Sequence, residues 1–368
     1  MKIAISGIEG FIGTHLKNYL GIHGEIEVTG IGRYEFENNS VLKNIVSSSD
    51  VIVHLAAVNR HDNPEELYSI NISLLDELIK TCVVTQSSPY IIFSSSLQEE
   101  QDNVYGKSKL KGQELLEKWS TDHRGRYTGL IIPNVFGPFG KPYYNSVIAT
   151  FCHQLANAED PKIETDKTLE LIYINHLVEI IWKLIQNPRY GKIKIPHQFQ
   201  YKVSELLNLL KGFGHLYLEQ KEIPAINNEF ELALFNTFRC YLPTHLYPVR
   251  FIKNEDARGV FIEIMRNHSG GQFSFSTTKV GITRGNHFHT RKVERFAVIK
   301  GEATIRIRRV DKKEIVVYAL KGDEPSFVDI PIWHTHSITN TGKEELITLF
   351  WINEPYVASD ADTYFLDV

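Results

Sequence analysis

Two different patterns of apolar and polar residues follow one another along the chain. Up to about residue 190, short apolar runs alternate with stretches in which apolar residues recur at helical spacing. The runs predict buried parallel strands, the stretches predict amphipathic helices, and their alternation predicts a doubly wound α/β sheet with helices on both faces. The predicted strands are Lys2–Ser6, Ile26–Ile31, Val51–Ala57, Tyr90–Phe93 and Gly129–Ile132, and the clearest predicted helices are Asn71–Cys82 and Lys109–Trp119.

From about residue 250 the pattern changes to short segments in which apolar and polar residues alternate, such as Ala303–Arg309 and Ile315–Leu320. Turn-forming residues separate these segments at a spacing of about 8–12 residues, which is typical of antiparallel sandwiches and barrels. Between the two patterns, Pro243 and Pro248 interrupt any periodicity. We therefore predict two domains, residues 1–245 and residues 246–368, with the boundary placed to within several residues.

Length, composition and charge agree with two globular domains. The chain has 368 residues, more than one hydrophobic core usually serves, and 42% of them are hydrophobic. Its net charge of −4, with both signs mixed along the chain, offers no basic surface to nucleic acid or to an anionic membrane. Cys82, Cys152 and Cys240 form no close pair, which fits a reducing cytoplasm. Because no apolar run reaches the roughly 18 residues of a membrane span, we expect a soluble, cytoplasmic protein without membrane or nucleic-acid partners.

A glycine loop directly follows the first predicted strand. It contains Gly7, Gly10, Phe11, Ile12 and Gly13, and it leads into a helical run. Glycines at this spacing permit a tight turn and a close approach of the backbone to a pyrophosphate, while the helix N-terminus offers N–H groups to an anion. We expect these five residues to bind a dinucleotide, and the alternative is a structural turn that binds nothing.

Arg33 lies at the end of the second predicted strand. Dinucleotide-binding folds usually carry an acidic residue there, which binds the ribose 2′-hydroxyl, whereas an arginine suits the 2′-phosphate of NADP. We therefore expect NADPH as the cofactor. Two alternatives stay open: Glu35 can face the ribose instead, and an arginine at a strand end is often a solvated charge.

Tyr105 and Lys109 are spaced so that one helix places them on the same face. They follow a strand that ends in three serines, so a hydroxyl can lie beside the phenol at the carboxyl edge of the sheet, where α/β folds bind ligands. A free phenol has a pKa of about 10, and a nearby ammonium together with a positive nicotinamide would lower that pKa toward neutrality. The group predicts acid–base catalysis by Tyr105, and the alternative is that the serines only cap a helix and the tyrosine only packs.

The most specific pattern lies in the second predicted domain. It has the spacing G(x)5HxH(x)4E(x)6G followed by P(x)4H(x)3N, and its candidate ligands are His287, His289, Glu294 and His336. On a strand, the first two histidines project to one face, and a second strand can bring His336 opposite them. Three imidazoles and one carboxylate suit Zn²⁺ or another divalent first-row ion with an open coordination position. The alternative is a group that keeps these side chains only as hydrogen-bonded polar residues of the core.

The first domain resembles the extended short-chain dehydrogenase/reductase family, a Rossmann-type fold. Residues 50–57 are similar to the strand that passes under the cofactor in that family, and residues 133–138 and 173–176 match later signatures. The resemblance places the catalytic hydroxyl on Ser96, although the triple serine leaves Ser95 open. It also implies the following residues at the cofactor or in catalysis: Leu55, Ala56, Ala57, Tyr105, Lys109 and Pro133.

The second domain resembles the cupin family, an all-β jelly-roll barrel, with Trp333 where the family signature has glycine. A reductase fused ahead of one cupin, with a closing segment at residues 362–366, resembles over its whole length the bacterial bifunctional enzymes of capsule and O-antigen synthesis that act in UDP-N-acetyl-L-fucosamine formation. The resemblance implies that a UDP-linked 2-acetamido-2,6-dideoxy-4-hexulose is epimerised at C3 in the cupin. It is then reduced at C4 with NADPH to UDP-2-acetamido-2,6-dideoxy-L-talose. We also expect a homodimer or a higher homo-oligomer.

Several interpretations stay open at this point. His334 projects from the same strand face as His336 and is our candidate for the proton-transferring base, with an aromatic or lysine neighbour as the alternative. For the whole chain, one alternative is a UDP-4-ketosugar reductase whose cupin serves only binding or dimerisation. Two others are a non-catalytic NADP-sensing protein and a cupin dioxygenase with an attached reductase. Metal content, deuterium exchange at C3 and oxygen consumption separate these alternatives.

Overall fold

Six parallel strands form the sheet of the first unit; the apolar pattern predicts five of them and misses the sixth, β8. A computed structural model describes residues 1–368. The strands lie in the order β2-β1-β3-β4-β5-β8, and every neighbouring pair is parallel. This order confirms the doubly wound α/β prediction, and it puts the reversal of strand order between β1 and β3, where such sheets bind ligands. The strands are β1 (Lys2–Ser6), β2 (Glu27–Ile31), β3 (Val51–His54), β4 (Tyr90–Ser96), β5 (Arg126–Ile132) and β8 (Gly191–Lys194).

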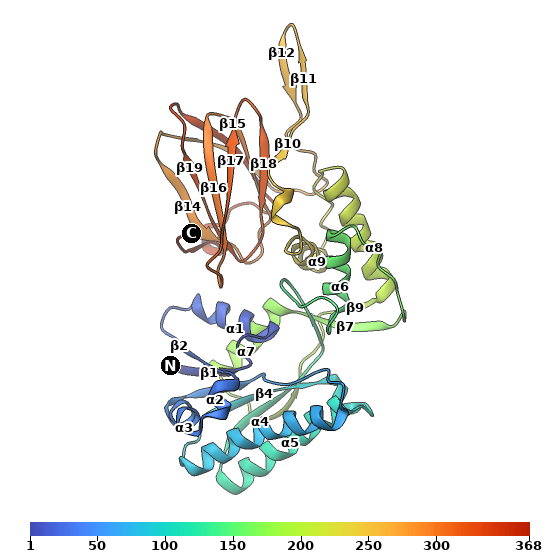
Figure 1. Cartoon of the computed structure of the whole chain (residues 1–368), viewed down its shortest axis with the longest axis vertical. Coiled ribbons are helices and arrows are strands. Elements are labelled where there is room, and N and C mark those ends of the chain that lie inside the picture. The colour runs from blue at the N-terminus through green and yellow to red at the C-terminus, as the bar shows by residue number, and fades with distance from the viewer. The chain divides into compact units, whose positions relative to one another are not determined.

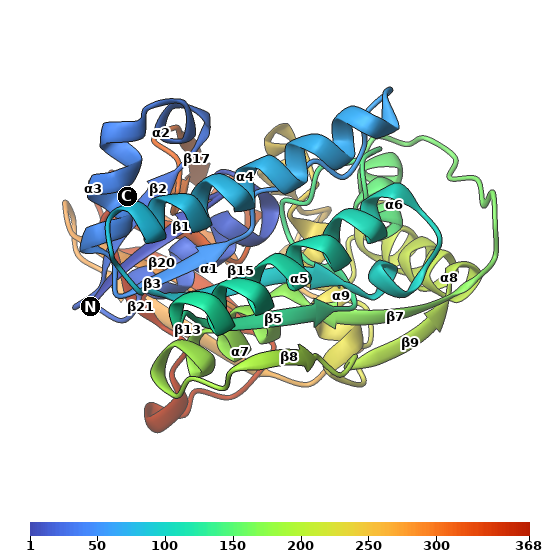
Figure 2. The same ribbon diagram turned by 90° about the horizontal axis from the view of Figure 1, so that it is seen from below.

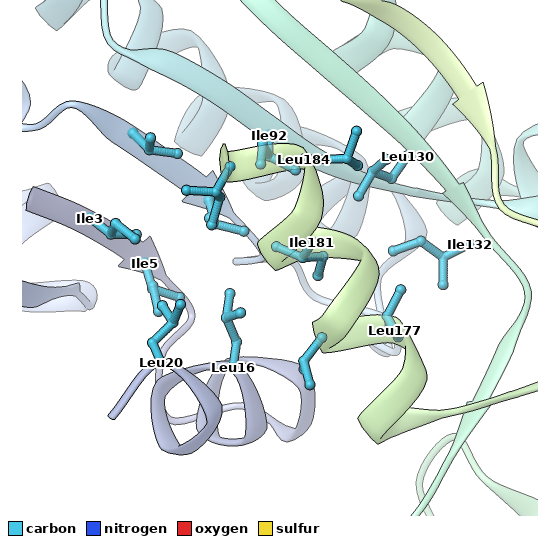
Figure 3. Packing of buried hydrophobic residues seen from close by; sticks show 14 of the residues in the cluster. Ile3, Ile5, Leu16, Leu20, Ile92, Leu130, Ile132, Leu177, Ile181 and Leu184 are labelled. Carbon is cyan, nitrogen blue, oxygen red and sulfur yellow. The ribbon is translucent and has the colours of Figure 1, made fainter. Parts of the chain in front are cut away.

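One face of this sheet is covered by α1 (Phe11–Gly21) and α7 (Ile174–Gln186). Side chains alternate along each strand, so every second residue of the inner strands points to these helices. Figure 3 shows the resulting core, in which Ile5 and Ile92 of the sheet face Leu16 and Ile181 of the helices. All four side chains are almost fully buried. Their packing fixes α1 against the sheet, and with it the glycine loop that connects β1 to α1.

The other face is covered by α3 (Asn39–Ser48), α4 (Pro64–Val84) and α5 (Val104–His123). Leu75 and Leu116, from α4 and α5, belong to the buried cluster on this side. Figure 2 shows α4 and α5 lying across the strands. Both predicted helices, residues 71–82 and 109–119, are confirmed, and each extends further at both ends. The earlier starts follow from Asn63 and Asn103, whose side chains cap the observed N-termini.

Further elements complete the first two-thirds of the chain, up to Leu246. A three-stranded sheet has the order β6-β7-β9, and the helices α6, α8 and α9 pack on one another. None of the helices combines the length and the apolar character needed to cross a membrane. These elements are α2 (Arg33–Glu37), η1 (Leu97–Glu100), β6 (Asn134–Phe136), α6 (Val147–Ala156), β7 (Thr168–Tyr173), β9 (Phe199–Lys202), α8 (Val203–Gly214), η2 (His215–Glu219), α9 (Glu229–Arg239) and η3 (Thr244–Leu246).

Two antiparallel five-stranded sheets form the region that the alternating pattern predicts (Figure 1). Their orders are β10-β18-β15-β20-β13 and β17-β16-β19-β14-β21, and a separate hairpin, β11-β12, projects from them. Val298 and Val328 of the first sheet pack with Ile305 and Ile338 of the second in a common core. The strands are β10 (Val249–Arg250), β11 (Lys253–Asp256), β12 (Gly259–Ile262), β13 (Gln272–Thr278), β14 (Thr283–Phe288), β15 (Glu294–Lys300), β16 (Glu302–Arg309), β17 (Ile315–Lys321), β18 (Ser326–Ile330), β19 (His334–Asn340), β20 (Leu346–Ile352) and β21 (Tyr364–Phe365), with η4 (Ala358–Asp360) before the last.

The chain divides into two compact units, and each unit is built from several segments that alternate along the sequence. The first unit comprises Met1–Phe136, Tyr144–Ser146 and Lys167–Tyr201, and the second comprises the remaining residues up to Val368. Residues 202–245 thus belong with the antiparallel sheets by their contacts. The predicted boundary after residue 245 stays a prediction, because contacts alone do not tell which piece folds independently.

A buried ion pair ties the helical part of the second unit to its sheets. Arg295 of β15 donates two hydrogen bonds to the carboxylate of Asp329 of β18, at 2.7 and 2.9 Å, and both side chains are at most 2% exposed. The hydroxyl of Tyr217, from η2, donates to the same carboxylate at 2.5 Å. The pair therefore joins three elements in a place that water does not reach.

Removing one partner of this pair should destabilise the protein strongly. Asp329→Ala leaves the guanidinium of Arg295 buried and uncompensated, so we expect the free energy of unfolding to fall by about 3–5 kcal/mol in urea denaturation. The double variant Arg295→Met/Asp329→Leu removes both charges and should cost much less. If Asp329→Ala unfolds at the same urea concentration as the unchanged protein, the pair contributes no stability.

Candidate functional site

The glycine loop has the geometry of an anion-binding turn. Gly7 has a positive φ of 70°, and a Cβ placed on Gly13 would lie 2.2 Å from the carbonyl oxygen of Gly7, so neither position accepts a side chain. α1 starts at Phe11 and Ile12, and its N-cap, Gly10, gives it no side-chain cap. The N–H groups of the first helical turn are therefore left for a ligand, as the sequence predicts.

The chain after β3 lies directly beside this loop. The hydroxyl of Ser6, the last residue of β1, accepts hydrogen bonds from the N–H groups of Leu55 and Ala56, both at 3.1 Å. A Cβ on Gly7 would lie 2.9 Å from the nitrogen of Ala56. Leu55, Ala56 and Ala57 are all half-buried and therefore line the loop at the point where the strand order reverses.

Arg33 and Glu35, the two alternatives for the ribose, are in different situations. Arg33 is exposed at the start of α2 and makes no hydrogen bond or ion pair. The carboxylate of Glu35 accepts a hydrogen bond of 2.7 Å from the N–H of Gly32. The carboxylate of Glu35 is thus engaged by the main chain, whereas the guanidinium of Arg33 is exposed and without a partner.

The three serines at the end of β4 have different partners. Ser94 donates its hydroxyl proton to a main-chain carbonyl at 3.2 Å, and Ser95 donates to the carboxylate of Glu99. The hydroxyl of Ser96 only accepts, from the N–H of Gln98 at 3.2 Å. Ser96 is half-exposed, whereas the other two are buried. Of the three, Ser96 is thus the serine whose proton is available to a ligand.

Tyr105 and Lys109 lie near these serines on the first turns of α5. The ammonium of Lys109 is buried, donates to the carbonyl of Ser94 at 2.8 Å and lies 5.6 Å from the centre of the Tyr105 ring. Burial lowers the pKa of Lys109 to about 7. Burial, with a smaller contribution from Tyr144, raises the pKa of Tyr105. The lowered phenol pKa that the sequence predicts is therefore not a property of the protein alone.

The carboxyl ends of four strands bring these groups to one edge of the sheet. β1 leads into the glycine loop, β3 into residues 55–57, and β4 into Ser96 and the helix of Tyr105. Pro133 is buried directly after β5, at the same edge. All residues that the sequence assigns to the dinucleotide or to hydride transfer thus lie at the strand ends where parallel sheets bind ligands.

The four candidate metal ligands form one group in the second unit. His287 of β14 pairs directly with His336 of β19. His289 follows β14, and Glu294 begins β15 in the other sheet. One ligand atom from each residue lies within 4.8 Å of all the others. The fold thus brings the four residues together as the spacing predicts, although they come from both sheets.

Each of the three imidazoles has one ring nitrogen hydrogen-bonded to the main chain. A carbonyl oxygen only accepts hydrogen bonds, so in the neutral ring this nitrogen carries the proton and the other nitrogen presents a lone pair. That tautomer is the one that binds a cation. The carbonyl partners are Gly285 for His287, Asp362 for His289 and His334 for His336, the last at 3.4 Å.

The buried polar atoms of this group fit a divalent cation. Nε2 of His289 and Nε2 of His336 lie 3.0 and 3.4 Å from Oε2 of Glu294, yet none of the three atoms has a hydrogen-bond partner of acceptable geometry. Unpaired polar atoms are costly in a protein interior, and a cation among them would satisfy all three.

Trp333, which stands where the predicted signature has glycine, has a left-handed backbone conformation. Its φ is 58°, which a bulky side chain rarely adopts, and it is only 1% exposed. Its N–H donates to the carbonyl of His289 at 2.7 Å, and its ring stacks on Phe288. Trp333 thus makes a main-chain contact with His289, one of the candidate metal ligands.

His334, the candidate base, begins β19 but does not belong to the four-residue group. Its Nδ1 faces the carbonyl of Ile332 at 2.9 Å, and its ring lies near Phe139. Burial, and then the charge of Arg309, lowers the pKa of His334 to about 4. The imidazole is thus neutral near pH 7, with Nε2 free to accept a proton, although the low pKa weakens it as a base.

The chain matches two family models and several known proteins. Residues 3–199 match the NAD dependent epimerase/dehydratase family, and residues 254–364 match the polysaccharide biosynthesis C-terminal domain. Over its whole length the chain is 32% identical to UDP-2-acetamido-2,6-beta-L-arabino-hexul-4-ose reductase from Pseudomonas aeruginosa, of which it covers 99%.

Solved structures agree with these matches. The capsular polysaccharide assembling protein CapF from Staphylococcus aureus is 36% identical, with both chains fully covered and a TM-score of 0.66. A UDP-N-acetylglucosamine 4-epimerase from Methanobrevibacter ruminantium, at 19% identity and a TM-score of 0.56, shares the fold over 65% of this chain and 97% of its own. The resemblance to two-domain enzymes of capsule synthesis is thus confirmed. This chain belongs to the NAD dependent epimerase/dehydratase family, and it carries a polysaccharide biosynthesis domain after it.

Proposed function

We propose that this chain is a bifunctional nucleotide-sugar enzyme. Its second unit epimerises C3 of a UDP-2-acetamido-2,6-dideoxy-4-hexulose with the help of a divalent ion. Its first unit then reduces the C4 ketone with NADPH to the UDP-2-acetamido-2,6-dideoxy-L-talose. The full-length relative from P. aeruginosa is named as a reductase of such a 4-hexulose, which supports the substrate class. The observation that supports the epimerisation is the group of half-buried His287 with buried His289, Glu294 and His336, the last three of which have unpaired polar atoms.

In the reductase site, NADPH would supply the hydride that C4 accepts. Tyr105 is placed to give the phenolic proton to the C4 oxygen, so that hydride and proton together turn the ketone into an alcohol. Ser96 has a free hydroxyl proton and can donate it to the same oxygen as a hydrogen bond. The ammonium of Lys109, near the Tyr105 ring, stabilises the phenolate that remains. Positive charge from the bound nicotinamide would add to this effect and offset the burial of the phenol.

In the metal site, His287, His289, Glu294 and His336 would hold Zn²⁺ or another divalent first-row ion. When bound, such an ion would stabilise the negative charge that develops when C3 beside the ketone loses its proton. His334 is our candidate for the group that takes this proton, because its Nε2 makes no hydrogen bond and it shares a strand with His336. Epimerisation is complete when C3 receives a proton on its opposite face, from water or from a second acid there, so the hydrogen that C3 gains comes from solvent.

A simpler function has one observation in its favour. The P. aeruginosa relative is named for reduction alone, so the second unit can instead be a binding or dimerisation module of a UDP-4-ketosugar reductase. The two functions differ in whether C3 exchanges its hydrogen with water. The predicted cytoplasmic location, the homodimer or higher oligomer, and the lack of nucleic-acid and membrane partners stay predictions in either case.

The proposal is tested by incubating the zinc-loaded protein with UDP-2-acetamido-2,6-dideoxy-4-hexuloses of both C3 configurations in D₂O, with and without NADPH. We expect NMR to show deuterium at C3 without NADPH and a C4 alcohol only with it. Reduction without any exchange at C3 would support the simpler function. Absence of reduction with both substrates would contradict the proposed substrate class.

Cofactor preference gives a separate prediction that rests on the free guanidinium of Arg33. We expect kcat/KM to be higher with NADPH than with NADH. Arg33→Ala should remove most of this preference, roughly a tenfold loss for NADPH if the phosphate contact contributes about 1.4 kcal/mol, and should barely change kcat/KM for NADH. Steady-state kinetics with both cofactors measures this. Equal use of the two cofactors by the unchanged protein would show that Arg33 only faces solvent.

A further inference from the structure

The last residues of the chain lie along β14, the strand that carries His287, one of the candidate metal ligands. β21 pairs with β14, with Phe365 opposite His287 and Tyr364 opposite Phe288. The N–H of Leu366 donates to the carbonyl of Asn286 at 2.9 Å, which extends this pairing. We call residues 361–367 the closing strap. The strap is therefore the outermost strand of the sheet that holds two of the three histidines.

Both ends of the closing strap are anchored to the second unit. At its start, the ammonium of Lys292 donates to the carbonyl of Ala361 at 2.5 Å. At its end, Thr335 donates to the carbonyl of Leu366, and Arg308 donates to the carbonyl of Asp367 at 2.5 Å. A segment fixed at both ends holds the residues between them in place.

Asp362, the second residue of the strap, binds the loop between two ligand residues. Its carboxylate accepts hydrogen bonds from the N–H and the hydroxyl of Thr290, at 3.0 and 2.7 Å, and from the N–H groups of Arg291 and Lys292, at 3.0 and 3.2 Å. These three residues directly follow His289 and lead towards Glu294. One buried carboxylate thus accepts the main-chain N–H groups of three of the four residues between His289 and Glu294; the fourth, Val293, donates to Asn353.

The main chain of Asp362 contacts a ligand directly. Its carbonyl oxygen accepts the hydrogen bond from Nδ1 of His289, which leaves Nε2 of that ring as the lone pair that points to Glu294. Asp362 has a φ of 43°, a left-handed conformation that aspartate adopts less readily than glycine. Such a conformation persists only where surrounding contacts hold it, and the four hydrogen bonds to the carboxylate do so.

We propose that Asp362 is a positioning residue of the metal site, which fixes the tautomer and the orientation of His289 through its carbonyl and the path from His289 to Glu294 through its carboxylate. The inference deepens the proposed function and rests on its metal site. Partners of this kind are known to orient metal ligands, and their loss usually costs about 10–100-fold in metal affinity. The closing strap would then help to position His289, a role that no sequence motif predicts.

The test compares three variants of the full-length protein. Asp362→Gly keeps the left-handed backbone and the carbonyl but removes the carboxylate. Asp362→Asn keeps one oxygen acceptor and tolerates the same backbone conformation. Asp360→Ala is the matched control, because the side chain of Asp360 is 70% exposed and contacts Arg291 but no ligand residue. The dissociation constant for Zn²⁺ is measured by competition with a chromogenic chelator, and the visible spectrum of the Co²⁺ form reports the ligand geometry.

We expect the Zn²⁺ dissociation constant to rise about 10–100-fold in Asp362→Gly, less in Asp362→Asn, and not in Asp360→Ala. The Co²⁺ spectrum should change in the same order. Thermal unfolding of each metal-free variant shows whether it is folded. If a folded Asp362→Gly protein binds Zn²⁺ as tightly as the unchanged protein, the inference is wrong. If Asp362→Gly does not fold, an Asp362→Asn protein with unchanged affinity overturns it instead. If the unchanged protein binds no divalent ion, the metal step of the proposed function fails as well.

Discussion

Replacing Tyr105 with phenylalanine should lower kcat for ketone reduction by about 10²–10⁴-fold and leave NADPH binding nearly unchanged. Tyr105 is half-buried at the start of α5, and the Nζ of Lys109 lies 5.6 Å from the centre of its ring. The substitution removes one oxygen and keeps the ring, so packing at the start of α5 is preserved. Only the proton that the C4 oxygen needs is lost.

Single-turnover oxidation of NADPH and fluorescence titration of the cofactor measure the two quantities separately. Tyr190→Phe is the matched control, because Tyr190 and Lys194 have the same spacing in the sequence but Tyr190 is 58% exposed, next to β8. We expect this control to keep full activity. Lys109→Ala should lower both turnover and cofactor binding, since its buried ammonium also supports the end of β4. If Tyr105→Phe keeps its turnover, Tyr105 is not the proton donor.

The choice among the serines shows what the sequence alone left open. Ser94, Ser95 and Ser96 are consecutive and identical, so the sequence does not indicate which hydroxyl faces the ligand. The structure distinguishes them because Ser95 donates to Glu99 whereas Ser96 only accepts from a main-chain N–H. Both contacts are local, yet they depend on the turn that η1 makes, and no periodicity predicts that turn. The sheet, by contrast, was predictable because five apolar runs of strand length recur between helical stretches.

The metal group was predictable for a different reason. Its four candidate ligands have fixed spacings in the sequence, and the antiparallel pairing of β14 with β19 sets His287 opposite His336. His289, which the spacing predicts on the same strand as His287, lies just after the end of β14. Two supporting features were not predictable. The left-handed conformation of Trp333 contradicts the preference of its residue type. The contact of His289 with Asp362 spans 73 positions and uses a main-chain oxygen, which has no sequence signature.

Removing the metal should abolish C3 exchange while leaving reduction of the correctly configured ketone in place. The metal-ligand residues and the group of Ser96, Tyr105 and Lys109 belong to different compact units. We expect a chelated protein, or His289→Ala, to lose deuterium incorporation at C3 by about 10²-fold or more, if the ion supplies several kcal/mol of charge stabilisation. The same proteins should still oxidise NADPH with a 4-hexulose that already has the epimerised C3. His215→Ala, an exposed histidine whose only ion pair is with Glu219, is the control.

The two parts of this prediction separate a catalytic ion from a structural one. Metal binding is often coupled to folding, and the unpaired atoms of His289, Glu294 and His336 are buried in the core between two sheets. A purely structural ion would therefore lower the thermal stability of the second unit, and both activities would fall together. Thermal unfolding of the chelated protein must accompany the assays for this reason. Loss of exchange in a protein that stays folded and still reduces its ketone assigns the ion to C3 chemistry, and exchange that persists in a folded, metal-free protein removes it from that role.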